Sequence, residues 1–287
     1  MTDNRPHSKV AKMNPQASPL VLVRRDGPLA RISLNRPEKH NAMNLAMLEQ
    51  LDDAVRGADA DPDVRVIVIS GEGRSFSTGH DMKESEQDPR VAELRASAEG
   101  LLAFESHYYY QFSLNVRNTK TPTIAQVHGH CLAAGLALVA MCDLAVASDD
   151  ARFGVPVVRF GLASGEMGYE VWEIGAKLAK ELLFTGDQID AQTAKEWGFL
   201  NRVVPRDKLE ETITAMAMKI AAQPPTAVSL LKASINGALD GMGQSNSLRQ
   251  HFITHLLSHS LGEAKANRAK REAEGKAAWT LGAKPER

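Results

Sequence analysis

Short β-branched runs and longer runs with helical spacing alternate along the chain. Residues 20–23 and 30–34 are apolar runs on either side of a turn at Arg25–Pro28, the pattern of a β-hairpin. Val64–Ser70 and Thr123–His128 are short and rich in β-branched residues, which is typical of buried strands. We therefore predict a hairpin followed by two buried strands.

Helical periodicity occupies the segments between these strands. Asn44 is the expected N-cap of a helix whose apolar residues recur at helical spacing over 45–55. Residues 89–117 predict one long helix that carries the aromatic run His107–Tyr110. A further helix, rich in small residues, begins near Ala133.

Two more strands are expected at 144–147 and 201–204. Strands that alternate with helical segments need crossover connections, so the pattern predicts a largely parallel sheet covered by helices. After Pro205 the pattern is helical throughout, with segments at 206–222, 225–240 and 245–260. The fold class is therefore α/β with a helical C-terminal part.

The same pattern predicts the domain organisation. Residues 1–18 have no period and are rich in polar residues, so we expect a disordered tail. Residues 19–205 form the predicted core and 206–261 a helical subdomain. Residues 262–287 carry seven Lys/Arg and four Asp/Glu, which predicts a solvated C-terminal extension.

Composition excludes several classes of protein. The 287 residues hold 34 Lys+Arg and 35 Asp+Glu, a net charge of −1, which argues against a generally basic nucleic-acid binder. No run is long and apolar enough to span a membrane, and the N-terminus lacks an apolar signal segment. The two cysteines, Cys131 and Cys142, have no zinc-site spacing and read as buried thiols of a reducing compartment. We expect a cytoplasmic protein.

Three segments have the backbone chemistry of a binding site. Residues 36–43 form a tight loop with two cations, which suits a phosphate or nucleotide-like group. Residues 76–84 lie one loop beyond a predicted strand and contain Gly79, which lets backbone N–H groups approach a ligand. Residues 128–138 run from a strand into a helix of small residues, a natural place for an oxyanion. Taken singly, each segment is more often a capped connection, a turn or a close-packing device.

Together, and in this order, these segments resemble the enoyl-CoA hydratase/isomerase family, also called the crotonase superfamily. The likeness covers roughly residues 19–261 and includes the later segments Phe153–Pro156 and Gly198–Val204. The resemblance implies a crotonase-like spiral of ββα units with a C-terminal helical oligomerisation subdomain. It also implies an acyl-CoA substrate, no cofactor beyond that coenzyme A, and assembly as a homotrimer or a dimer of trimers.

The resemblance implies that two backbone N–H groups, here of His80 and Ala134, polarise the thioester carbonyl and stabilise an enolate-like oxyanion. The family has a small residue at position 80 and Gly at position 134, but either residue here supplies an amide. The imidazole of His80 either faces solvent or takes part in the chemistry. By motif position, the expected contacts to the acyl-CoA are Lys39, Asn41, Ala42, Thr78, His80, Asp81, Met82, Ala134 and Val157.

This chain departs from the family at its catalytic acids. Hydratases of the family use two glutamates, and the matching positions here are Ala137 and Val157. Neither side chain transfers a proton, so a two-glutamate hydration mechanism is not expected.

Glu166 is the candidate replacement, because family isomerases use a single acid/base that comes from this region and one carboxylate both removes and returns a proton. Apolar neighbours such as Met167 are expected to raise its pKa. The alternative is a surface glutamate at a turn. Glu170 and Glu173 are expected to be solvated, and Asp81 to orient its loop.

No metal site is expected, because His128 and His130 lack a third ligand. Arg24 or Lys39 would contact the CoA phosphates. Tyr108–Tyr110 pack within the helix or line the acyl pocket, with at least one ring facing inward.

Three functions stay open on the sequence. The first is an acyl-CoA isomerase or other enolate-forming enzyme that uses Glu166. The second is an enoyl-CoA hydratase in which another group, such as His80, activates water. The third is a non-catalytic acyl-CoA-binding protein.

Overall fold

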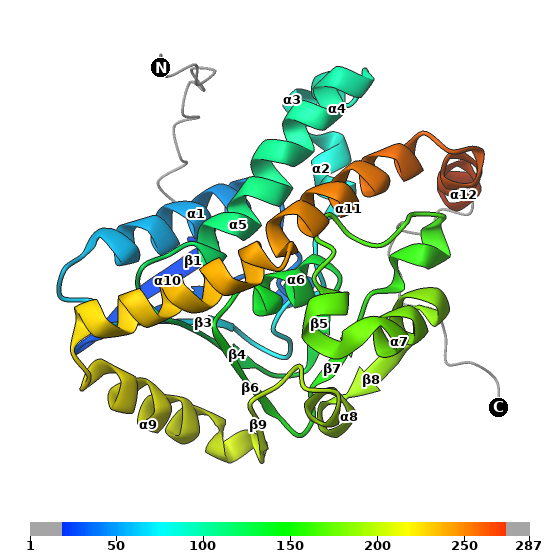
Figure 1. The fold of residues 1–287 in the computed structure, drawn as a ribbon. Helices are drawn as coiled ribbons and strands as arrows, with labels where there is room; N and C mark the ends of the chain where they lie inside the picture. The colour runs from blue at the N-terminus through cyan, green and yellow to red at the C-terminus, as the bar shows by residue number, and fades with distance from the viewer. Residues whose placement is uncertain (1–18, 274–287) are drawn as a thin grey trace.

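The computed structural model of the chain describes residues 19–273 and is built on a six-stranded sheet (Figure 1). The strands lie in the order β1-β2-β3-β4-β6-β9. The first pair is an antiparallel hairpin and each later pair is parallel. Their bounds are β1 Val21–Asp26, β2 Leu29–Leu34, β3 Val66–Gly71, β4 Thr123–Val127, β6 Leu144–Ser148 and β9 Arg202–Val204. The predicted hairpin and the mainly parallel, covered sheet are confirmed.

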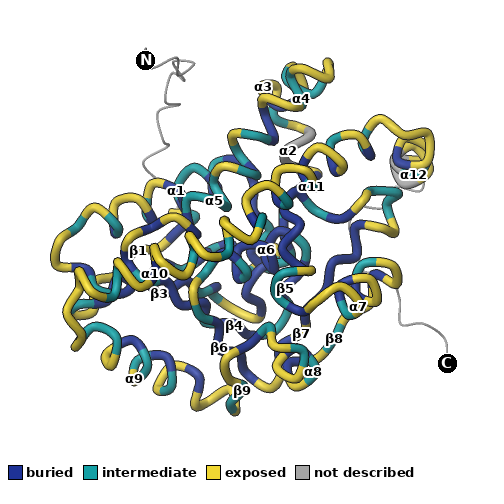
Figure 2. The backbone as a smooth tube through the Cα atoms, viewed as in Figure 1, coloured by how far each residue is buried: buried dark blue, intermediate teal, exposed yellow. Residues whose placement is uncertain are grey.

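Helices cover both faces of this sheet because its strands are apolar on both faces. Helix α1 (Leu45–Ala60) begins at Asn44, whose side chain accepts a hydrogen bond of 2.9 Å from the N–H of Met47. Ile32 and Ile69 share one core with α1, whereas Val68 packs on the other side with α9 (Leu209–Ala221). Figure 2 shows the resulting buried centre at β3, β4 and β6.

A smaller sheet extends the spiral. It joins β5 (His130–Leu132), β7 (Arg152–Gly154) and β8 (Gln188–Asp190). The helices around it are α6 (Ala134–Ala140), α7 (Glu170–Thr185) and α8 (Ala191–Glu196), and η3 (Pro156–Phe160) is a short 3-10 helix. Two further 3-10 turns are η1 (Pro37–Lys39) and η4 (Arg206–Lys208).

The single long helix expected over 89–117 is wrong. The segment contains α3 (Pro89–Leu94), α4 (Ala98–Glu105), a π-helical stretch η2 (Ser106–Gln111) and α5 (Phe112–Arg117), after α2 (Met82–Gln87). The break comes at Ser97, whose hydroxyl accepts a bond of 3.0 Å from the N–H of Gly100 and so starts a new helix. The wider π turn carries the aromatic run.

The C-terminal helices are α10 (Pro225–Gly241), α11 (Gln244–His259) and α12 (Gly262–Ala273). Buried polar contacts fix α10 to the core. Lys232 Nζ lies 2.7 Å from Asp143 Oδ2 and 2.8 Å from Thr119 Oγ1. Arg117 reaches α10 and α11 through Asp240 and Gln244, each at 2.8 Å. In Figure 1, α10 and α11 follow one another beside α5.

The exposed faces of α10 and α11 carry several large apolar side chains. Figure 2 shows α10 as largely exposed and α11 as partly buried. The exposed apolar side chains on α10 and α11 include Leu230, Leu231, Ile235, Ile253 and Leu257, and Met242 between the two helices is exposed as well. Across residues 19–273, the helices are each too short or too polar to cross a membrane. The predictions for residues 1–18 and for 274–287 lie outside the described residues.

Candidate active site

Two of the loops singled out in the sequence lie side by side. Ser77 and Cys131 form a parallel bridge. The N–H of Ser77 donates to the carbonyl of His130 at 3.1 Å, and the N–H of Leu132 donates to the carbonyl of Ser77 at 2.9 Å. These bonds bring the backbone at His80 next to the start of α6 at Ala134.

Glycines make this close approach possible. A Cβ at Gly79, which has φ +95°, would lie 3.1 Å from the backbone nitrogen of Ala134. A Cβ at Gly135 would lie 2.7 Å from the carbonyl oxygen of Ser77. Ala133 adopts φ 48°, a backbone conformation rare for residues other than glycine that orients the peptide preceding Ala134. Strain of this kind often marks functional sites.

The N–H groups of His80 and Ala134 are available to a ligand. Within residues 19–273, neither of them donates a hydrogen bond. Ala134 is the first residue of α6, where no intrahelical acceptor exists. Neighbouring N–H groups are occupied: that of Met43 donates to the carbonyl of Gly79, and that of Asp81 donates to the carbonyl of Met43, each at 2.8 Å.

The loop at 36–43 holds the neighbouring loop with Gly79 and His80 in place. Asn41 is fully buried and its side chain accepts from the N–H of Arg36 at 2.8 Å and donates to the carbonyl of Ser75 at 2.7 Å. Arg36 pairs with Asp81 at 3.1 Å, so Asp81 holds its loop in place. Lys39 is exposed and Ala42 half-buried. Asn41 and Asp81 therefore act on the site through the backbone that they fix.

His80 and Glu166 form a buried pair. Nε2 of His80 lies 3.3 Å from Oε1 of Glu166, and their side chains are 11% and 5% exposed. The ring of His80 also stacks on Tyr109, with centroids 3.7 Å apart. Two alternatives left open by the sequence are therefore wrong: His80 does not face solvent, and Glu166 is not a surface glutamate. Tyr109 is buried and faces inward, as expected for at least one ring of the run, and Tyr108 also lines a pocket.

The protonation of the pair follows from its contacts. Burial raises the pKa of Glu166, but the charge of His80 and its hydrogen bond lower it more, and the net pKa lies below the ordinary value. The expected rise in pKa beside Met167 is wrong because it took no account of His80. An ionised Glu166 only accepts, so Nε2–H of His80 donates to it, and the buried Nδ1 of His80 has no partner among the described residues.

Two adjoining pockets share His80, Tyr109, Ala134 and Glu166 in their walls. The remaining walls differ in chemistry. One pocket, here called the apolar pocket, is lined mainly by hydrophobic side chains, among them Met43, Leu48, Leu51, Phe112, Val116 and Leu138. The other, here called the polar pocket, is lined by Thr78, Met82 and Val157 and by the ionisable residues Arg95, Glu105, His255 and His259.

The two positions that the family resemblance matches to the hydratase glutamates hold buried, apolar side chains. Ala137 is buried inside α6 and is 3% exposed. Val157 is 5% exposed and lines the polar pocket. Glu166 lines both pockets together with His80 and Ala134, whereas Glu105 lines only the polar pocket.

Sequence reasoning missed Glu105, His255 and His259 as pocket residues. The two histidines stand four residues apart in a predicted helix, which places them on one face, and this spacing was the available signal.

The sequence-based expectation for Glu170 was also wrong. This residue is 3% exposed and burial raises its pKa to about 7, so the expectation of a solvated side chain is wrong. Glu173 is half-buried.

The family model described as enoyl-CoA hydratase/isomerase matches residues 24–272. The chain belongs to this family of enzymes. Among the relatives, the mitochondrial enoyl-CoA hydratase domain-containing protein 3 of Rattus norvegicus is 36% identical over 226 residues, 77% of this chain and 71% of that protein.

Solved structures of the family share the fold. An enoyl-CoA hydratase/isomerase from Xanthobacter autotrophicus Py2 superposes with a TM-score of 0.77 at 30% identity, over 89% of this chain and 98% of that one. An enoyl-CoA hydratase from Mycobacterium smegmatis superposes with a TM-score of 0.81 at 28% identity, over 89% and 90%. The predicted crotonase fold is confirmed.

Proposed function

We propose that this chain is an enolate-forming acyl-CoA enzyme of the isomerase type, in which Glu166 is the acid/base. The observation that carries the proposal is the ionised, buried Glu166, held by His80 in the wall that also contains Ala134. Both positions at which the family's hydratases have glutamates are apolar. One base beside one oxyanion site is what a double-bond shift requires.

The amides of His80 and Ala134 are proposed to bind the thioester oxygen. Glu166 removes the proton from the α-carbon, and the electron pair of the broken C–H bond enters the enolate, whose negative oxygen the two amides stabilise. Glu166 then returns the proton at the γ-carbon, which moves the double bond into conjugation. The chemistry needs no cofactor apart from the coenzyme A of the substrate.

The apolar pocket is the proposed site of the acyl chain, because it offers hydrophobic side chains directly beside Glu166. Thr78, Met82 and Val157 border the same reacting centre from the polar pocket. Lys39 and Arg24 are exposed cations, and Lys39 stands in the loop that supports the site. Lys39 is therefore our proposed contact to the CoA phosphates, with Arg24 as the alternative.

Hydration is a second candidate because of one observation. In the neutral form of His80, Nε2–H donates to Glu166, and the buried Nδ1, which has no partner among residues 19–273, is then the nitrogen that takes up a proton. In that mechanism Glu166 orients His80, and His80 takes a proton from water. The hydratase names of several relatives fit this alternative.

We also propose assembly as a trimer or a dimer of trimers. The exposed apolar side chains of α10 and α11, such as Leu230, Leu231 and Ile235, support it, because large apolar patches on a soluble surface usually mark an interface. Sedimentation equilibrium measures the assembly directly.

The deciding experiment is exchange of α-protons of a saturated acyl-CoA in deuterated water, followed by NMR, together with loss of the conjugated absorbance of crotonyl-CoA. Glu166→Gln is expected to slow exchange by about 10²–10⁴-fold with acyl-CoA affinity nearly unchanged. The control Glu181→Gln changes an exposed glutamate of α7 and should keep full exchange.

Three results would contradict the proposed isomerase mechanism. Full exchange in Glu166→Gln removes Glu166 as the base. Rapid hydration of crotonyl-CoA that His80→Ala abolishes selects the hydratase mechanism. Tight acyl-CoA binding without any exchange in the unaltered protein indicates a binding protein.

A further inference from the structure

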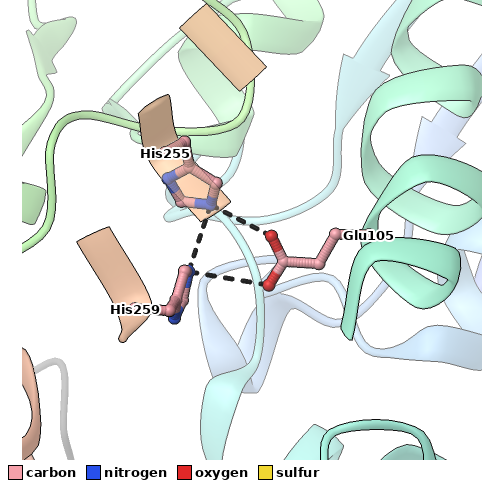
Figure 3. A group of neighbouring side chains, drawn as sticks. All are labelled: Glu105, His255 and His259. Atoms are coloured by element: carbon pink, nitrogen blue, oxygen red, sulfur yellow. Dashed lines mark hydrogen bonds and ion pairs between the residues drawn. The ribbon is translucent and has the colours of Figure 1, made fainter. Parts of the chain in front are cut away.

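The far wall of the polar pocket holds two imidazoles and a carboxylate that face one another. His255 and His259 lie one turn apart on α11, and Glu105 is the last residue of α4 (Figure 3). The side chain of Glu105 is 1% exposed and those of the histidines 7% and 11%. Figure 3 shows both rings directed at the carboxylate.

Two distances from His255 match the edges of a metal coordination sphere. Nε2 of His255 lies 3.1 Å from Oε2 of Glu105 and 3.2 Å from Nε2 of His259, and one ligand atom from each of the three residues lies within 4.8 Å of the other two. With bonds of about 2.0–2.2 Å, ligand atoms around a transition metal lie about 3.0–3.5 Å apart. The side chains therefore need little movement to share one ion.

The tautomer of His255 also favours a cation at this point. Its Nδ1 lies 3.0 Å from the carbonyl oxygen of Ser164, which only accepts, so Nδ1 carries a hydrogen. In the neutral ring, Nε2 then presents a lone pair to the carboxylate of Glu105. Two lone pairs at this distance repel each other unless a proton or a metal ion lies between them. A hydrogen bond from Nδ1 to a carbonyl is also the usual support of a metal-bound histidine.

Arg95 completes the surroundings of the carboxylate. Its Nη2 donates to Oε1 of Glu105 at 3.0 Å, which fixes the carboxylate and leaves Oε2 directed at His255. Hydrogen-bonded carboxylate ligands are common in metal sites. The guanidinium binds Oε1 of Glu105 and does not lie between Oε2 and His255.

We propose that Glu105, His255 and His259 form a binding site for one divalent transition-metal ion of the Zn²⁺ class. Two imidazoles and a carboxylate are a ligand set that such ions use when further coordination positions stay open. All three residues line the polar pocket, so an open position would face the space beside Glu166. Water or an oxygen of a bound acyl group is the ligand that this position takes.

The test uses the full chain without a polyhistidine tag, treated with chelator and then titrated calorimetrically with Zn²⁺ and with Co²⁺ at pH 7.5. We expect one ion per chain and a rise in the melting temperature when Zn²⁺ is added. Binding should release protons, because His255 must present its unprotonated nitrogen to the metal. Titration in two buffers that differ in ionisation enthalpy measures this release.

Variants distinguish this site from adventitious binding. His259→Gln should weaken Zn²⁺ affinity at least about 10-fold, and Glu105→Gln should do the same. His107→Gln, which changes an exposed histidine close to Glu105 in the chain, should leave affinity unchanged. Circular dichroism checks folding, and His259→Gln alone decides the matter if Glu105→Gln does not fold.

Two results would overturn the proposal. One is the absence of saturable binding at one ion per chain for both metals. The other is affinity that survives His259→Gln, since the ion then lies elsewhere. No acyl-CoA enters these measurements, so their outcome is independent of the proposed isomerase activity.

Discussion

The imidazole of His80 stacks on the phenol ring of Tyr109, with planes inclined by 16° and centroids 3.7 Å apart. Tyr109 belongs to the π-helical stretch η2, and π-helical turns occur frequently at functional sites. The stack covers one face of the ring while Glu166 binds its Nε2. Together they hold His80 in one orientation.

Loss of this stack should therefore impair turnover more than binding. Aromatic stacking contributes about 0.5–1.5 kcal/mol, so Tyr109→Leu is expected to lower the α-proton exchange rate about 3–10-fold. Tyr109→Phe keeps the stacked ring and should retain most of the rate. Tyr110→Leu is the control, because Tyr110 stacks on Phe252 and lines neither pocket. Equal rates in Tyr109→Leu and Tyr110→Leu would show that the stack does not position His80.

Gly79 sets the spacing of the two donor amides. A methyl group there would meet Ala133 and the nitrogen of Ala134 at 3.1 Å, and its φ of +95° disfavours any side chain. We expect Gly79→Ala to reduce exchange by about 10²–10³-fold, the usual effect of losing one oxyanion donor.

Gly27→Ala is the matched control for this change. Gly27 also has positive φ, but it lies in the β1–β2 turn with open space around it. Exchange rates, corrected for the fraction of folded protein, compare the two variants. A rate in Gly79→Ala as high as in Gly27→Ala would mean that the amide of His80 does not stabilise the oxyanion.

Glu170 makes the stability of the fold dependent on pH. Burial raises its pKa to about 7 from the ordinary value of 4.5, and the charge of Glu166 adds to the rise, while Ser164 donates a hydrogen bond to it at 3.2 Å. The unfolded chain therefore binds fewer protons than the folded chain between these pH values. Stability falls as pH rises through this range.

Glu170→Gln removes this penalty. We expect the variant to gain on the order of 1–3 kcal/mol of unfolding free energy over the unaltered protein at pH 8, with little gain at pH 4. Urea unfolding at both values measures the difference, and Glu181→Gln should show no such pH-dependent gain. A gain that is equal at pH 4 and pH 8 would contradict the assigned titration.

Local pattern predicted the elements whose contacts are local. The hairpin β1–β2, the N-cap at Asn44 and the strands β3 and β4 follow from periodicity and turn residues within a few positions. The paired loops at Ser77 and Cys131 were also accessible, because the family resemblance places them at one site.

The side-chain pairs were not predictable because they join distant parts of the chain. His80 and Glu166 are 86 residues apart in sequence, and Glu105 and His255 are 150 apart. Whether a polar residue is solvated or buried beside a partner depends on such contacts. The break at Ser97 was missed for a different reason, since a serine within a helical pattern is as consistent with an interior position as with a cap.

The order of synthesis gives the C-terminal helices a further significance. A growing chain that has left the ribosome as far as Gly241 already contains both donor amides and Glu166, but α11, with His255 and His259, is still missing. The polar pocket of such a chain lacks the wall that His255 and His259 form. Completion of the polar pocket therefore requires α11, which follows Gly241 in the chain and carries His255 and His259.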